Sequence, residues 1–125
     1  MNRAIISIGS NVEPQGNVRA AIEFLAARHR VVAQSRPMET DAVGRPGQPK
    51  YLNAAVVIET PLGLDALRAT LTDVEAELGR VRTDDKFAPR TIDLDVITWN
   101  DQIVHPDYAE RAFLRDLVRE VTQMR

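Results

Sequence analysis

The order of strands and helices constrains the fold of this chain most, and the hydrophobic periodicity of the sequence predicts that order. Apolar and β-branched runs predict the main strands at Ala4–Ile8, Arg30–Ser35, Tyr51–Thr60 and Arg90–Trp99. Apolar residues at helical spacing predict one helix from about Gln15 to Arg28 and another from Leu64 to Leu78 that stops at Gly79. The predicted order is therefore strand, helix, strand, strand, helix, strand.

This order is that of the split-βαβ, ferredoxin-like α+β plan. In that plan an antiparallel sheet carries both main helices on one face and leaves the other face partly open for a site. Two connections, Met38–Lys50 and Gly79–Pro89, are predicted to be long loops, and their length favours a functional role. A short returning strand is predicted at Gln102–Val104. A C-terminal helix is marked by the apolar residues Phe113, Leu114, Leu117, Val118 and Val121.

Length and composition favour one globular domain, 1–125, which is large enough to bury a core. No apolar run approaches the roughly 20 residues that a membrane span needs, so we expect no membrane partner. Cysteine is absent, and a cytoplasmic location is the simplest expectation. The net charge of −2 argues against a general nucleic-acid binder, so an anionic ligand must be small and held by local positive charge. The sequence does not determine an oligomeric state.

Two carboxylates stand one strand repeat apart in the segment "RTIDLDVITW", residues 90–99. The alternation predicts that one face of this strand carries Thr91, Asp93, Asp95, Ile97 and Trp99. Side chains two residues apart on a strand project from the same face, with Cα atoms roughly 6.5–7 Å apart. Such a pair can share one divalent cation or hold two, and Mg²⁺ prefers oxygen ligands of this kind. A solvated acidic face explains the same pattern and remains open.

Basic residues gather just before this strand, at Arg80, Arg82, Lys86 and Arg90. Guanidinium groups bind phosphate oxygens two at a time. Cations beside paired acids therefore suit a polyphosphate bound through a metal ion. Surface salt bridges to nearby acids are the alternative explanation.

A second group of residues suits a flat heterocycle. Tyr51 and Asn53 share one strand face, and Phe113 lies beyond a turn near His105. Aromatic faces can sandwich a ring, and an amide can donate and accept hydrogen bonds along the ring edge. Both aromatic residues could instead be ordinary core residues, and a lone loop histidine is often incidental. The sequence has neither a Walker A pattern nor a G-x-G-x-x-G pattern.

Five segments of the chain occur together, and in the same order, in one enzyme family. They are "SIGSN" at 7–11, "YLNAAV" at 51–56, "GRVR" at 79–82, "APRTIDLDVI" at 88–97 and "HPDYAERAF" at 105–113. With these segments the chain resembles the 6-hydroxymethyl-7,8-dihydropterin pyrophosphokinases of folate biosynthesis. The resemblance implies a ferredoxin-like fold and the transfer of a diphosphate from ATP to the hydroxymethyl group of the pterin, with AMP as the other product.

The resemblance also implies roles on the nucleotide side of the site. Asp93 and Asp95 would hold two Mg²⁺ ions that bridge the ATP phosphates, and Arg80 and Arg90 would contact those phosphates. The remaining family positions on the nucleotide side are Arg82, His105, Arg111 and Glu75, the last with a less defined role.

On the pterin side, the resemblance implies that Tyr51 and Phe113 sandwich the ring and that Asn53 contacts its polar edge. Thr40 and the backbone near Val43 would complete this pocket.

Two other classes of function stay open at this point. The connection between Asp95 and His105 is shorter than in the family, and Phe87-Ala88 replaces a Trp-Gly pair. A pterin- or nucleotide-binding paralogue without turnover, or with altered specificity, is therefore an alternative. A protein- or RNA-interaction module would also suit the fold, but the sequence lacks the basic sheet and exposed aromatic pair of an RNA-binding surface.

Overall fold

The computed structural model describes residues 1–42, 47–80 and 91–124 of the chain. Its centre is a six-stranded antiparallel sheet with the order β2-β4-β1-β5-β6, and β3 pairs with the part of β4 that extends beyond β2. The strands are β1 (Asn2–Ser10), β2 (Arg30–Gln34), β3 (Met38–Thr40), β4 (Tyr51–Thr60), β5 (Asp93–Trp99) and β6 (Gln102–Ile103). The four main strands have the order of a ferredoxin-like sheet, so the predicted α+β fold is confirmed.

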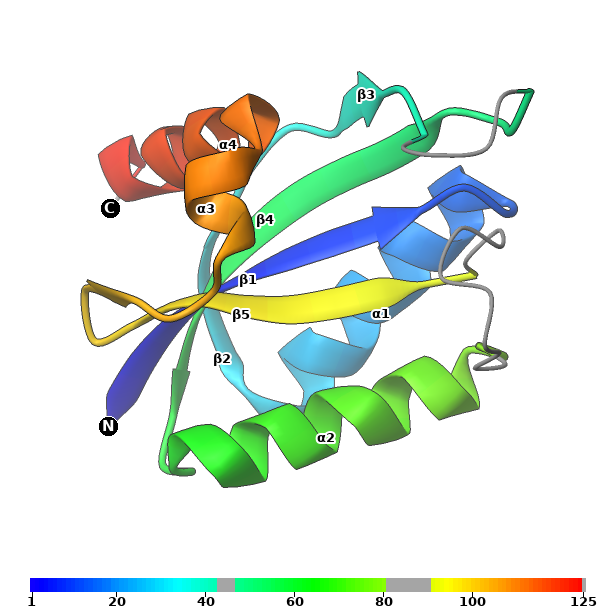
Figure 1. Cartoon of the computed structure of the whole chain (residues 1–125). Coiled ribbons are helices and arrows are strands. Elements are labelled where there is room, and N and C mark those ends of the chain that lie inside the picture. Colours follow the sequence, from blue (N-terminus) through cyan, green and yellow to red (C-terminus); the bar gives the residue numbers. More distant parts are fainter. Residues whose placement is uncertain (43–46, 81–90, 125) are drawn as a thin grey trace.

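The helices lie on both sides of this sheet (Figure 1). They are α1 (Pro14–Arg28), α2 (Leu64–Glu77), α3 (Asp107–Glu110) and α4 (Ala112–Gln123). The helices α1 and α2 cover one face, where Ile6 and Ile8 of β1 pack with Leu25 of α1 and Leu67 of α2 in the larger hydrophobic core. Within the described ranges, no helix is long and apolar enough to cross a membrane.

The second face of the sheet is covered over only part of its length. The buried residues of α4 are Leu114, Leu117, Val118 and Val121, which recur at helical spacing. They form a second hydrophobic core with strand residues that include Ile5, Val57 and Ile97. Beyond this core the same strand faces continue with residues such as Ser7, Asn53 and Asp95, which line a cavity. The prediction that this face is partly open is therefore confirmed.

The loop predicted at Met38–Lys50 is wrong at its start, because Met38–Thr40 forms strand β3. Three residues are too few to show a periodicity, and β3 forms because β4 extends past β2 and offers it backbone partners at Leu52 and its neighbours. The short helix α3, between the predicted strand and the C-terminal helix, was also not predicted.

The predicted position of Trp99 is wrong as well. The pairing of β1 with β5 shifts between Ile5 and Ile6, because Ile6 pairs with Val96 while Ile5 pairs with Thr98. Ile97 is thus an extra residue on β5, as in a β-bulge. The bulge resets the alternation, so Trp99 packs against the core beneath α1 and α2 rather than lying on the face of Asp93 and Asp95.

His29 follows the last residue of α1, and its ring nitrogens are shielded from solvent. Its backbone N–H donates to the Leu25 carbonyl at 2.8 Å, but within the described part of the chain neither ring nitrogen has a hydrogen-bond partner. Burial and, secondly, the Arg28 charge lower the pKa of His29 below its usual value of 6.5. Folding therefore favours the neutral form of this ring.

We predict that His29→Leu stabilises the fold by about 1–2 kcal/mol at neutral pH, because it removes two unsatisfied polar atoms. A base with a lowered pKa contributes stability that is lost as the pH falls below the unfolded-state value of 6.5. The gain should therefore grow as the pH falls below about 6.5. Urea unfolding of both proteins across this range checks the prediction, and a variant that is less stable at every pH would contradict it.

Candidate active site

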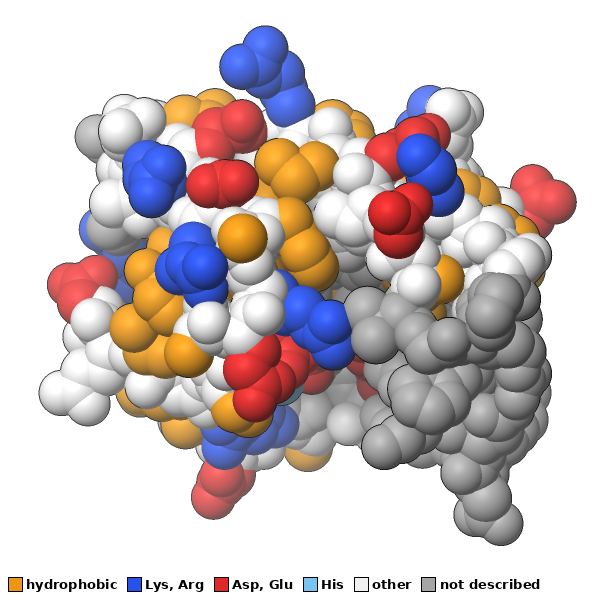
Figure 2. Space-filling model, turned by 45° about the horizontal axis from the view of Figure 1, so that its top comes forward, with side chains coloured by type: hydrophobic (Ala, Val, Ile, Leu, Met, Phe, Trp, Pro, Cys, Tyr) orange, Lys and Arg blue, Asp and Glu red, His pale blue; other side chains and the backbone are white. Residues whose placement is uncertain are grey.

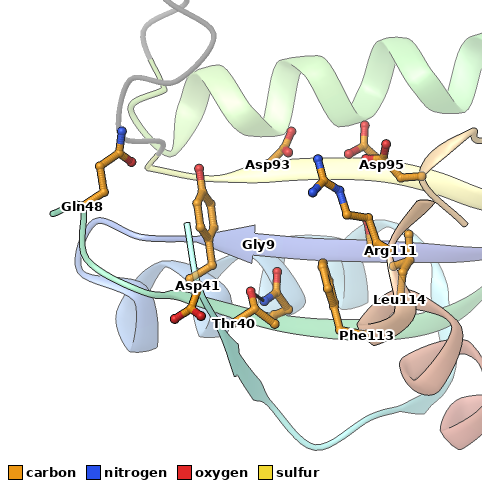
Figure 3. Close-up of a pocket in the computed structure, with 13 residues that line it drawn as sticks. Gly9, Thr40, Asp41, Gln48, Asp93, Asp95, Arg111, Phe113 and Leu114 are labelled. Carbon is orange, nitrogen blue, oxygen red and sulfur yellow. Dashed lines mark hydrogen bonds between the residues drawn. The ribbon is translucent and has the colours of Figure 1, made fainter. Parts of the chain in front are cut away.

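Two neighbouring cavities lie beside β5, and the first, on the open sheet face, has a mixed polar and aromatic lining. Its volume is about 330 Å³, which is within the roughly 300–1,000 Å³ of small-molecule sites. Figure 3 shows side chains from β5 on one side and from α4 and the segment after β3 on the other, with Gly9 of β1 between them. Its lining includes Ser7, Gly9, Thr40, Gln48, Tyr51, Asn53, Asp93, Asp95, Arg111 and Phe113.

The second cavity is more highly charged and has a volume of about 540 Å³. Its walls come from α2, β5 and the segment that leads into α3. Its lining includes Arg68, Thr72, Glu75, Arg80, Asp93, Asp95, His105 and Asp107. Three acidic residues line both cavities, namely Asp93, Asp95 and Asp107. The two cavities therefore meet at these carboxylates.

Strand pairing places the two central carboxylates. Asp93 pairs with Gly9 and Asp95 pairs with Ser7, so both side chains project from the open face as the alternation predicts. Burial, followed by the charge of Asp93, raises the pKa of Asp95 from 3.8 to about 6. Two like charges held this close suit a cation between or beside them. Among the described residues, no group of three or more His, Cys, Asp or Glu side chains is arranged to hold a metal ion.

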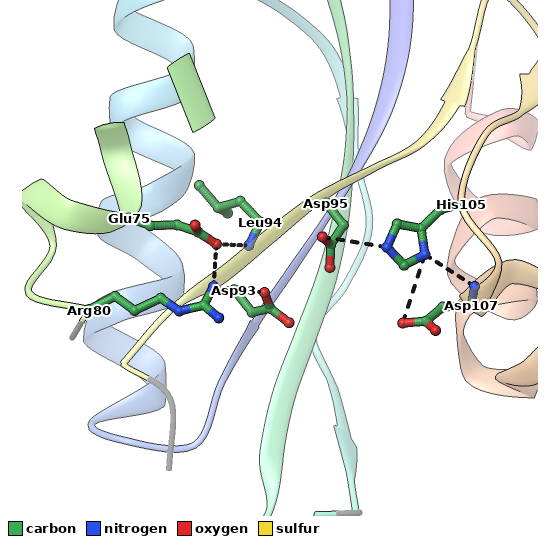
Figure 4. A network of polar contacts seen from close by, with 7 residues as sticks. All are labelled: Glu75, Arg80, Asp93, Leu94, Asp95, His105 and Asp107. Atoms are coloured by element: carbon green, nitrogen blue, oxygen red, sulfur yellow. Dashed lines mark hydrogen bonds and ion pairs between the residues drawn. The ribbon is translucent and has the colours of Figure 1, made fainter. Parts of the chain in front are cut away.

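Asp93 is held by an ion-pair network that begins on α2 (Figure 4). The Nη1 atom of Arg80 donates to Oε2 of Glu75 at 2.7 Å and to Oδ1 of Asp93 at 3.0 Å. The side chains of Arg80 and Glu75 are only 11% and 4% exposed, so these are not the weak surface pairs of the alternative explanation. The network fixes the direction of Asp93 and brings a guanidinium group to the second cavity.

Glu75 also satisfies an open edge of the sheet. Next to Asp93 and Asp95, β5 pairs with β1 on one side, while β6 pairs only with Thr98 and Trp99. The Leu94 backbone N–H donates instead to Oε2 of Glu75 at 2.8 Å. A buried N–H group without a partner would cost free energy, so this carboxylate replaces the missing strand neighbour. Glu75 therefore ties α2 to the strand that carries both site acids.

His105 lies on the other side of Asp95. The Asp107 backbone N–H donates to Nδ1 of His105 at 3.1 Å, so the neutral ring carries its proton on Nε2. Nε2 lies 3.6 Å from Oδ1 of Asp95, and the His105 side chain is 25% exposed. The histidine therefore presents an N–H group to the junction of the two cavities rather than standing free in a loop.

The first cavity has a fixed amide at its side. Asn53 is 7% exposed, and its Nδ2 atom donates to Oγ1 of Thr40 at 2.7 Å. Tyr51 lies two residues away on the same strand face, and Phe113 lies across the cavity at the start of α4. Phe113 also packs against the core beneath α4, so it has both a structural contact and a face near the cavity. This arrangement can hold a flat ring whose edge forms hydrogen bonds.

Every nominated site residue within the described ranges lines one of the two cavities. Arg111, which the resemblance assigns to the nucleotide side, lines the aromatic cavity here. Val43, Arg82 and Arg90 lie outside the described residues, as do Lys86 and Phe87-Ala88. The individual roles of all these residues stay predictions.

Sequence reasoning did not nominate several other lining residues, which are Ser7, Gly9, Gln48, Arg68, Thr72 and Asp107. The predicted strand ended at Ile8, whereas β1 continues to Ser10 and includes Gly9. A glycine inside a strand often marks a close approach, so a correct strand boundary could have drawn attention to Gly9. The others depend on contacts between distant elements, which no local pattern reveals.

A ferredoxin-like sheet with a ring-sized cavity and a charged cavity that meet at paired carboxylates is the framework of a two-substrate group-transfer protein. A sequence model of the family described as 7,8-dihydro-6-hydroxymethylpterin-pyrophosphokinase matches residues 5–123, and the chain belongs to this family. The resemblance inferred from the sequence is thereby confirmed.

Individual relatives agree with the family. The chain is 38% identical to 2-amino-4-hydroxy-6-hydroxymethyldihydropteridine pyrophosphokinase of Methylorubrum extorquens, over 91% of this chain and 78% of the relative. It is 36% identical to the protein of the same name from Pseudomonas putida, over 82% of this chain and 86% of the relative. The likeness to the Bacillus subtilis protein of that name is 35%, over 98% and 79% of the two chains.

We predict that Asp95→Asn stabilises the metal-free protein at about pH 8. An acid with a raised pKa costs stability as the pH rises from its usual value of 3.8 through its folded value of about 6. One pKa unit corresponds to about 1.4 kcal/mol, and solvent screening leaves a gain of about 1–2 kcal/mol. Urea unfolding in EDTA should show this gain at pH 8 and almost none below pH 4, and an equal gain at both pH values would contradict a charge effect.

We also predict that Glu75→Ala destabilises the protein by about 3 kcal/mol, because it leaves the Arg80 guanidinium and the Leu94 N–H without this acceptor. Glu77→Ala is the matched control on the same helix, since its side chain is 52% exposed and its ion pair with Arg28 spans 3.6 Å. The control should change stability by less than about 0.5 kcal/mol. Equal effects of the two substitutions on urea unfolding would show that the network does not stabilise the fold.

Proposed function

We propose that this protein transfers a diphosphate group from ATP to the hydroxymethyl group of 6-hydroxymethyl-7,8-dihydropterin, giving AMP and the pterin diphosphate. Its place would be in folate biosynthesis, as in the family to which it belongs. One observation carries the proposal: a cavity suited to a flat ring and a charged cavity share Asp93 and Asp95. A bound ring and a bound polyphosphate would thus meet at a pair of carboxylates.

We expect Asp93 and Asp95 to hold Mg²⁺, in two ions as the resemblance implies. The fit rests on the donor set, because proteins commonly bind Mg²⁺ through one or two carboxylates together with water and phosphate oxygens. The raised pKa of Asp95 supports this, because a nearby cation would stabilise the ionised carboxylate. When bound, Mg²⁺ would neutralise charge on the phosphate oxygens.

The chain's own residues would position the reacting groups. Arg80, oriented by Glu75, faces the charged cavity and can bind phosphate oxygens, while His105 can donate through Nε2. The pterin hydroxyl oxygen would attack the β-phosphorus and lose its proton to solvent, the bond from that phosphorus to the α,β-bridging oxygen would break, and AMP would leave. Phosphoryl transfer of this kind depends on alignment and charge neutralisation more than on a protein nucleophile.

The aromatic cavity would select the acceptor. A pterin ring between Tyr51 and Phe113 would place its polar edge at the Asn53 amide. Thr40 accepts a hydrogen bond from the amide nitrogen, so the Asn53 side chain is already oriented before a ring binds. This orientation lowers the entropic cost of recognition.

The alternative functions make different demands. A paralogue that binds without turnover would keep the cavities and lose the reaction, and the assay below separates it from an enzyme. A nucleic-acid surface would need a continuous basic patch, whereas Figure 2 shows acidic and basic side chains interspersed on one face of the described part of the chain. The absence of nucleic-acid partners, the cytoplasmic location and the single-domain organisation stay predictions.

We predict that the protein, incubated with ATP, Mg²⁺ and 6-hydroxymethyl-7,8-dihydropterin, produces AMP and the pterin diphosphate in equal amounts. Chromatographic separation of the nucleotides and pterins measures both products, and EDTA should stop their formation. Asp95→Ala should lower kcat by about 100- to 1,000-fold or more, because charge stabilisation in the transition state is lost.

Asp116→Ala is the control for this experiment, because Asp116 is an exposed carboxylate on α4, 55% accessible at its side chain. It should leave kcat within about twofold of the wild type. Production of ADP instead of AMP would contradict the proposed reaction. Pterin binding without any AMP from the wild type would favour the binding paralogue.

A further inference from the structure

Gly9 occupies the centre of the open sheet face, although the family roles described above do not include it. We propose that Gly9 is a specificity-determining position whose missing side chain leaves room for the acceptor ring between Asn53 and the carboxylate pair. The inference rests on the proposed function, and it identifies the feature of the cavity floor that lets the ring approach the phosphates.

The strand register places Gly9 between the two halves of the site. On one side Gly9 pairs with Asn53 of β4, and on the other side it pairs with Asp93 of β5. Directly opposed residues of antiparallel strands have their Cβ positions roughly 4.5–5.5 Å apart on the same face. Any side chain at position 9 would therefore stand between the Asn53 amide and the Asp93 carboxylate.

The need for glycine at position 9 comes from the lack of space for a side chain, not from the backbone conformation. Gly9 lies inside β1, and the glycines with positive φ in the described chain are Gly47 and Gly79. A Cβ atom built at Gly9 would come within 3.0 Å of Oδ1 of Asn53 and 3.7 Å of Cδ1 of Tyr51. An added methyl group would thus press on two residues that line the aromatic cavity.

Asn53 has little freedom to move away from such a methyl group. Its Nδ2 atom donates to Oγ1 of Thr40 at 2.7 Å and lies 3.4 Å from the Met38 carbonyl oxygen, and the residue is almost fully buried. Rotating the amide would weaken the Thr40 hydrogen bond and turn the oxygen away from its present direction. A side chain at position 9 would therefore either displace the amide or hold a bound ring off the sheet.

The two substrates should respond differently to this change. Gly9 lines the aromatic cavity, whereas the described lining of the charged cavity comes from α2, β5 and the segment before α3. A methyl group at position 9 should therefore weaken ring binding and misplace the hydroxymethyl group while leaving nucleotide binding intact. A general loss of structure would weaken both.

The test compares Gly9→Ala with Gly16→Ala, a control in α1 where an added Cβ meets nothing within 4 Å. The dissociation constants of the pterin and of a Mg²⁺-bound non-hydrolysable ATP analogue are measured by titration calorimetry, together with KM and kcat. Gly9→Ala should raise the pterin Kd and KM about tenfold or more, since tenfold corresponds to about 1.4 kcal/mol. The nucleotide Kd should stay within about twofold, and Gly16→Ala should match the wild type in both.

A double-mutant cycle with Asn53→Ala tests whether the contact is the cause. Once the Asn53 side chain is shortened, adding Gly9→Ala should raise the pterin Kd by less than about threefold. Thermal unfolding of all four proteins identifies a variant that fails to fold. If Gly9→Ala alone does not fold, the pterin Kd of Asn53→Ala with and without Gly9→Ala still shows whether the methyl group is tolerated once the amide is gone. Unchanged pterin binding in Gly9→Ala, equal losses for both substrates, or full additivity in the cycle would each overturn the inference. A wild-type protein that neither binds nor converts the pterin would instead refute the proposed function.

Discussion

The partial covering of one sheet face is the constraint on which the candidate site depends. Apolar side chains on α1 and α2 bury one face, whereas α4 buries only the part of the other face that contains Ile5, Val57 and Ile97. The same strands then continue with small and polar side chains on that face. Since the strands pair and side chains alternate along each of them, residues of β1, β4 and β5 that are distant in sequence meet on this face. The rigid sheet can therefore hold an amide and a carboxylate on neighbouring strands with little freedom to move.

Charge in the site is organised by buried contacts rather than by the net charge of the chain. Glu75 receives hydrogen bonds from Arg80 and from the Leu94 backbone, so one carboxylate supports both a cation and a strand edge. Asp95, in contrast, is held near Asp93, and its raised pKa reflects burial and repulsion that the fold tolerates. Such a cost at a cavity wall is typical of functional sites. Because these local contacts set the charge of the site, a protein with net charge −2 can still accommodate phosphate oxygens and cations there.

Much of the fold could be predicted from the sequence, because Leu67 and Leu71 follow a helical period and Leu94 and Val96 follow a strand period. The bulge at Ile97 and the strand Met38–Thr40 could not, since both depend on pairing with another strand. The shared face of Asp93 and Asp95 was predicted from their spacing. Only the family resemblance favoured a cation site over a solvated acidic face. Gly9 was missed because its importance comes from the residues that pair with it on the two neighbouring strands. A local sequence pattern does not predict the register between strands that are distant in the sequence.

The central expectation is that a ring and a nucleotide bind together on either side of the cation site at Asp93 and Asp95. Paramagnetic relaxation by Mn²⁺ in a ternary complex with the pterin and a non-hydrolysable ATP analogue tests this claim most directly. We expect Mn²⁺ to accelerate the relaxation of both the nucleotide phosphorus nuclei and the pterin methylene protons, and we expect both effects to disappear when both aspartates are replaced by asparagine. Competition between the two ligands, or an effect on one of them alone, would contradict the account.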